Sequence, residues 1–127
     1  MRLKHLFVLH AVVALGYAAA VLAAPKPFMS FYGISLADPG TTYLARLFAA
    51  ALLIYSFVAW LARDSEDSVA RRAIVLGFFL TEVIAFILSL IAQLSGVMNA
   101  FGWSVVATYL VFMVGYGYFY FIKSDVA

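Results

Sequence analysis

Glu82 is the residue of this sequence whose position most strongly suggests chemistry. It lies in an apolar stretch, AIVLGFFLTEVIAFILSLIAQL, about nine residues or ~14 Å from the start of that stretch. A carboxyl group near the middle of a bilayer costs on the order of 2.5–3.5 kcal/mol to insert, so it must face a partner, a cavity or the interior of a helix bundle. Two interpretations follow. Glu82 forms a site for a proton, a cation or a quinone headgroup, or it is a protonated acid with a structural hydrogen bond.

Other polar residues share a helix face or a membrane depth with Glu82. At 100° per residue, Ser89 and Gln93 fall on the same helix face as Glu82, which predicts a polar stripe from the midplane to the outer surface. Tyrosines in the other apolar stretches lie at comparable depths, and their hydroxyls can donate to a carboxylate. The candidate ligand-binding or proton-handling residues are therefore Glu82, Tyr17, Tyr55, Tyr109, Gln93 and Ser89.

His10 lies about one turn inside the first apolar stretch. Histidine ligates haem or chlorophyll in some membrane helices, and Ala14 one turn later leaves room for a flat macrocycle. The other histidine, His5, is on the same stretch and nearer the surface, so it offers no opposite axial ligand. We expect His10 to form a hydrogen bond to a neighbouring helix instead. The aromatic run from Tyr116 to Phe121 is expected to be an interfacial anchor.

The composition excludes several classes of protein. Of the 127 residues 67% are hydrophobic and 11% are charged, whereas a soluble domain has roughly 25% charged residues. This argues against a soluble enzyme, a disordered tail and a nucleic-acid-binding protein. The chain has no cysteine, which excludes disulfides and thiolate metal sites. It contains no recognisable catalytic motif, and we expect no metal site.

Four apolar stretches must position these residues. We expect membrane-spanning helices over residues 6–24, 43–62, 73–94 and 101–122, within one domain that covers residues 1–127. The first stretch also resembles a signal peptide, although Pro25 would make a poor cleavage site. The connector over 25–42 is apolar and rich in Pro and Gly, which predicts a re-entrant or surface turn at the interface. Thr41 or Thr42 is expected to cap the second helix, and Asp67 or Ser68 the third.

The loop charges predict an orientation. If the helices alternate in direction, six cations lie on the side of both termini: Arg2, Lys4, Arg63, Arg71, Arg72 and Lys123. The opposite side has two, Lys26 and Arg46. The expected fold is an all-α, up-down-up-down four-helix bundle in a bacterial cytoplasmic (inner) membrane, with both termini in the cytoplasm.

Two helix faces carry specific expectations. Residues 82, 86, 89 and 93 should face other helices, while Ile84, Leu88 and Ile91 should face lipid. Gly16, Ala20 and Ala24 form a row of small residues, which either closes the bundle or contacts another copy or subunit.

The arrangement resembles the DoxX-like small four-helix membrane proteins of bacteria. The shared features are the connector PKPFMSFYG, a second stretch that opens YLARLFAAALL and ends WLAR, and the basic restart ARRAIVLG. The resemblance implies a four-helix fold, and some members are associated with quinone-linked oxidation of sulfur compounds.

We therefore expect a membrane protein without catalytic residues of its own. The first interpretation is an accessory or structural subunit, or a standalone bundle, whose partners are lipid and either other membrane subunits or another copy. The alternative is a quinone- or proton-handling component centred on Glu82, with a quinone as the candidate cofactor and haem or chlorophyll disfavoured.

Overall fold

The computed structural model describes residues 1–123, and this part of the chain is helical without β-strands. Its elements are α1 (Leu3–Ala23), α2 (Pro25–Phe31), α3 (Pro39–Ala62), α4 (Val69–Leu94), α5 (Gly102–Gly117) and a π-helical turn, η1 (Tyr118–Ile122). Four helices are long and apolar enough to cross a membrane: α1, α3, α4, and α5 together with η1. The predicted all-α class and the four long apolar helices are confirmed.

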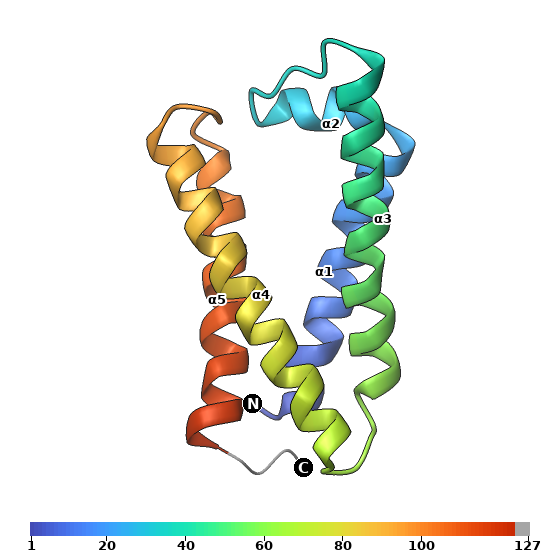
Figure 1. Cartoon of the computed structure of the whole chain (residues 1–127), viewed down its shortest axis with the longest axis vertical. Helices are drawn as coiled ribbons and strands as arrows, with labels where there is room; N and C mark the ends of the chain where they lie inside the picture. Colours follow the sequence, from blue (N-terminus) through green and yellow to red (C-terminus); the bar gives the residue numbers. More distant parts are fainter. Residues whose placement is uncertain (124–127) are drawn as a thin grey trace.

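The helices form two side-by-side pairs. Figure 1 shows α1 packed along α3 and α4 packed along α5, with α2 lying across the upper end of the first pair. The pairs meet at the lower end and separate toward the upper end. A cluster of large buried side chains joins the pairs at the lower end, including Phe7 of α1, Phe78 of α4, and Phe112 and Tyr116 of α5.

Buried residues recur at helical spacing along α1 and α4, as one packed face requires. In α1 this face consists of Leu3, Leu6, Phe7, His10, Ala11, Ala14, Ala18 and Val21. Alanines on α1 and α3 let the two backbones approach closely, and Ser56 of α3 donates a hydrogen bond of 2.8 Å to the Ala11 carbonyl. In the predicted row of small residues, Gly16 of α1 and Ala24 just after it are exposed, and Ala20 is half-buried.

Several predicted boundaries were wrong by three or four residues. Helix α3 begins at Pro39 rather than at 43 because Asp38, and not Thr41 or Thr42, is the cap; its carboxylate accepts a 3.0 Å hydrogen bond from the Thr41 amide. Helix α4 begins at Val69 rather than at 73, after the predicted cap Ser68. These polar first turns precede the apolar stretches, so hydropathy alone places the starts too late.

The connector also differs from the expected turn. Its first part is the seven-residue helix α2, which Pro25 can start because a first-turn residue needs no intrahelical N–H partner. The helix ends before Gly33, whose positive φ of 79° favours glycine.

On α4, Ile84, Leu88 and Ile91 are each more than half exposed, and this confirms the predicted outward face.

Candidate ligand-binding site

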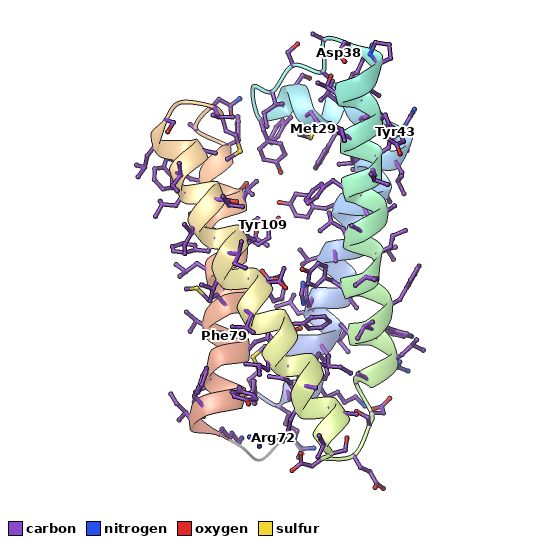
Figure 2. The ribbon with its side chains drawn as sticks, viewed as in Figure 1. Met29, Asp38, Tyr43, Arg72, Phe79 and Tyr109 are labelled. Carbon is purple, nitrogen blue, oxygen red and sulfur yellow. The ribbon has the colours of Figure 1, made fainter. Side chains whose placement is uncertain are left out.

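The central feature is a cavity of about 400 Å³ between the two helix pairs, above the aromatic cluster. Its walls come from α1 to α5 and are mainly aliphatic and aromatic. Figure 2 shows Tyr109 of α5 and Met29 of α2, which line the space from different sides. The polar side chains in its walls are His10, Tyr17, Tyr32, Tyr55, Thr81, Glu82, Ser89, Thr108 and Tyr109.

Three polar side chains from three helices meet at the lower end of this cavity. The His10 Nδ1 of α1 lies 2.8 Å from the Tyr116 hydroxyl of α5, and the His10 Nε2 lies 3.4 Å from a Glu82 carboxyl oxygen of α4. All three residues are at most 5% exposed. Together they form a continuous chain, the Tyr116–His10–Glu82 chain, between elements that are far apart in the sequence.

The ring of His10 is held in place by aromatic neighbours. It stacks on Phe112 with a centroid separation of 4.2 Å and meets Phe78 edge-on at 5.3 Å. Tyr55 lies beside it at 5.2 Å. Rotation of the ring is blocked on these sides, so both nitrogens keep their partners. The expected hydrogen bond from His10 to a neighbouring helix is the one with Tyr116. The other ring nitrogen faces Glu82.

Glu82 has one carboxyl oxygen without a partner among the described residues. Oε1 faces His10, whereas Oε2 is buried and makes no hydrogen bond. An unsatisfied buried polar atom costs about 1–3 kcal/mol, and native proteins contain few of them. Because Glu82 lines the cavity, a ligand or water placed there is within reach of this carboxyl group.

Five of the six predicted candidates line this cavity, and Glu82 is one of them. Tyr17, Tyr55, Tyr109 and Ser89 all lie in its walls. Gln93 does not: its amide donates a 3.0 Å hydrogen bond to the Asn99 carbonyl, and it packs closely against Gly102. The polar stripe on α4 therefore ends before the outer surface, because the turn after α4 folds back over Gln93.

Tyr116 is part of the candidate site although it was not among the six predicted candidates. The interfacial-anchor interpretation is wrong for this residue, which is fully buried; Tyr118, two residues later, is 43% exposed. The spacing contained a signal, since Tyr109 and Tyr116 are seven residues apart and therefore lie on one helix face. Thr81, Thr108 and Tyr32 also line the cavity without having been singled out.

The upper end of the cavity is covered by contacts between α2 and the turn after α4. The Asn99 side chain donates to the Phe31 carbonyl at 2.9 Å, and the Asn99 amide donates to the Tyr32 carbonyl at 2.9 Å. Phe31 and Phe101 pack with ring centroids 4.5 Å apart. A Cβ on Gly33 would lie only 3.3 Å from the Asn99 nitrogen, so this approach favours glycine. We call this set of contacts the upper clasp.

Beneath the clasp, Tyr32 and Tyr17 form a second polar group. The Tyr32 hydroxyl donates to the Tyr17 hydroxyl at 3.3 Å. Burial, reinforced by this bond, raises the pKa of Tyr32 to about 12. Tyr32 therefore remains a neutral hydrogen-bonding group at physiological pH. Within residues 1–123, no group of three or more His, Asp or Glu side chains is placed to hold a metal ion.

Comparisons with known proteins place the chain in one family. No curated protein and no solved structure matches the chain. A family model described as a domain of unknown function, DUF8292, matches residues 1–121. Because this match spans all five α-helices and most of η1, the chain belongs to the DUF8292 family.

Proposed function

We propose that the protein is a multi-pass protein of a bacterial cytoplasmic membrane that binds a lipophilic molecule with a small polar headgroup, of the quinone class. The spans alternate in direction and both termini lie in the cytoplasm, as the excess of cations at that end favours. His10 and Glu82, which line the cavity, bind the headgroup and handle its proton, and Tyr116 extends the chain behind His10. The proposal is carried by one observation, the unpartnered Glu82 oxygen in a largely apolar cavity.

The size and lining of the cavity support a small lipophilic ligand. A volume of about 400 Å³ falls within the range of roughly 300–1,000 Å³ that is typical of small-molecule sites. Such sites combine apolar walls with a few polar groups that orient the ligand. Here the orienting groups are gathered at the lower end, where the Tyr116–His10–Glu82 chain ends in a carboxyl group.

The position of the rim supports entry from the bilayer. Phe48 of α3 and Leu88 of α4 line the cavity and are both more than half exposed, so they mark its rim between the two helix pairs. The upper clasp covers one end, and the aromatic cluster fills the other. A molecule dissolved in the hydrocarbon layer therefore reaches the cavity without crossing water.

The hydrogen-bonding capacity of Glu82 suits both redox forms of such a ligand. A protonated carboxyl group donates to a quinone carbonyl oxygen, and a carboxylate accepts from a quinol hydroxyl. The two tautomers of a neutral His10 place its proton either on the nitrogen beside Glu82 or on the one beside Tyr116. The imidazole thus links the headgroup position to Tyr116.

Ligand-induced stabilisation of the detergent-solubilised protein tests this proposal. The probe is a benzoquinone with a decyl chain, and decylbenzene is the control ligand because it lacks the carbonyl groups. At 100 times Kd, binding adds about 2.7 kcal/mol of stability. We expect this gain for the wild type and for the exposed-face variant Ile84→Ala, and its loss for Glu82→Leu. Equal responses to the two compounds, or no response, would refute the headgroup site.

A membrane-subunit role is the second candidate, and the exposed face of α1 favours it. Gly16, in the predicted row of small residues, is exposed, and another transmembrane helix could pack closely against it. A DoxX-like subunit of a quinone-linked oxidoreductase would combine both roles. Sizing of the native particle after mild solubilisation distinguishes them: a lone particle without partners removes the subunit interpretation.

A further inference from the structure

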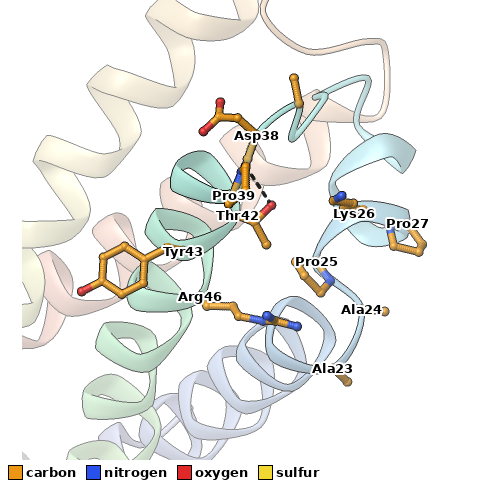
Figure 3. A pocket seen from close by; sticks show the side chains of 11 residues that line it. Ala23, Ala24, Pro25, Lys26, Pro27, Asp38, Pro39, Thr42, Tyr43 and Arg46 are labelled. Atoms are coloured by element: carbon orange, nitrogen blue, oxygen red, sulfur yellow. Dashed lines mark hydrogen bonds between the residues drawn. The ribbon is translucent and has the colours of Figure 1, made fainter.

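A second cavity lies at the junction of α1, α2 and α3, outside the site described above. It measures about 690 Å³ and is lined by Ala23, Ala24, Pro25, Lys26, Pro27, Ala37, Asp38, Pro39, Thr42, Tyr43 and Arg46. Two of its three charged residues are cations. Figure 3 shows the Arg46 side chain extending from α3 toward the α1–α2 junction, on the same side as Lys26, while Tyr43 points away.

Arg46 lies near the upper end of a candidate membrane span, and it is exposed. It lies seven residues after Pro39, which places its Cα about 10 Å along a helix that is long and apolar enough to span a membrane. Within residues 1–123, its guanidinium makes no hydrogen bond and no ion pair. Arginine within a span normally pairs with an anion or reaches the interface. The structure therefore leaves a strong donor group directed into a cavity.

The single carboxylate in this cavity is already engaged. Asp38 accepts hydrogen bonds from the backbone amide and the hydroxyl of Thr41, at 3.0 and 3.2 Å, and thereby caps α3. These bonds lower the pKa of Asp38, which stays ionised at neutral pH. Lys26 and Arg46 carry two positive charges and Asp38 carries one negative charge, so the cavity has a net positive charge.

We propose that this cavity binds a phosphate group through Arg46 and Lys26. The planar guanidinium offers two parallel N–H donors that match two phosphate oxygens, and the Lys26 ammonium adds a second charge. The small side chains of Ala23 and Ala24 leave space at the wall. The phosphate belongs either to an anionic lipid headgroup or to a soluble phosphate. The inference does not depend on the ligand at Glu82.

Titration of the detergent-solubilised full chain with defined phosphates tests the proposal. The probes are dioctanoyl phosphatidylglycerol, dioctanoylglycerol (the same chains without phosphate) and inorganic phosphate, and the readout is the thermal unfolding midpoint. We expect a concentration-dependent rise with the phosphatidylglycerol and none with dioctanoylglycerol. A rise with inorganic phosphate as well assigns the site to soluble phosphate, whereas a rise with the lipid alone assigns it to a headgroup.

Charge-removing variants identify the site. Arg46→Gln and Lys26→Gln should each weaken apparent affinity by about fivefold or more, as expected for the loss of one cation near a phosphate. Lys123→Gln removes a cation at the opposite end and should bind like the wild type. Lys26 is exposed, so we expect Lys26→Gln to fold, and its affinity for phosphate can be measured even if Arg46→Gln fails to fold. Equal responses to both dioctanoyl compounds, or wild-type affinity in Lys26→Gln, would overturn the proposal.

Discussion

Replacing Tyr116 by phenylalanine removes one oxygen atom from the Tyr116–His10–Glu82 chain and nothing else. The hydroxyl lies 2.8 Å from His10 Nδ1, and both residues are buried. The phenyl ring keeps its contacts with Phe7 and Phe78, whose centroids lie 5.9 and 5.3 Å away. No large cavity forms, so the loss consists mainly of a buried nitrogen left without a partner. That loss corresponds to about 1–3 kcal/mol.

Thermal unfolding in detergent measures the effect. For a chain of this size, 1 kcal/mol corresponds to about 4 °C, so Tyr116→Phe should lower the midpoint by about 4–12 °C. The matched control is Tyr118→Phe, two residues along the chain, where the ring is 43% exposed and the hydroxyl has no hydrogen bond within residues 1–123. We expect the control to change stability by at most about 0.5 kcal/mol.

A double-mutant cycle tests the cause. In a His10→Phe background the nitrogen is absent, and Tyr116→Phe should cost at least about 1 kcal/mol less than it does in the wild type. The phenylalanine at position 10 keeps a ring to stack on Phe112. Equal midpoints for Tyr116→Phe and Tyr118→Phe would refute the reasoning, as would the same cost in both backgrounds.

Four further predictions concern the cavity, its cover and one helix cap. Glu82→Gln should fold with near wild-type stability because the amide keeps hydrogen-bonding capacity, whereas Glu82→Leu should lose about 1–3 kcal/mol by stranding His10; equal melting of both variants and the wild type would contradict this. Ala85→Leu should fill part of the cavity and abolish stabilisation by the decyl benzoquinone without lowering the melting temperature, so retained ligand binding would argue against the assigned pocket. Asn99→Ala should accelerate amide hydrogen exchange in α2 by opening the upper clasp, with unchanged exchange as the contrary outcome. Hydrogen bonds from Thr41 lower the pKa of Asp38, so the cap stabilises the fold above pH of about 4 and loses this effect as the pH falls further. The difference in melting temperature between the wild type and Asp38→Ala should therefore shrink from pH 7 to pH 3. A constant difference would contradict this prediction.

The helices were predictable because apolar length and a 3.6-residue period are local properties. The outward face of α4 at Ile84, Leu88 and Ile91 followed from Glu82 alone, since one costly side chain orients a whole helix. The helix starts were less accurate because Asp38 and Ser68 cap turns that precede the apolar residues. Local capping chemistry therefore extends α3 and α4 beyond what hydropathy indicates.

The site was only partly predictable because it depends on which helices become neighbours. Counting residues from the helix ends gives the depth of Tyr17, Tyr55 and Tyr109, and all three line the cavity with Glu82. Depth does not give the rotation of one helix against another, so the bond between His10 and Tyr116 was not foreseen. The two helix pairs meet at the lower end, where α1 contacts α5, and this places the two residues opposite each other.

The bond between His10 and Tyr116 can form only late in the synthesis of the chain. The two residues are 106 positions apart, in the first and last long helices. At roughly 5–20 residues per second, a ribosome needs about 5–20 s to make the chain between them. The bond from Ser56 to Ala11 becomes available earlier, so α1 and α3 can pair during synthesis. Until Glu82 has been made, His10 has neither of its partners, and it lacks Tyr116 for the whole interval. During this time nascent α1 depends on water, lipid headgroups or the insertion machinery to satisfy its imidazole.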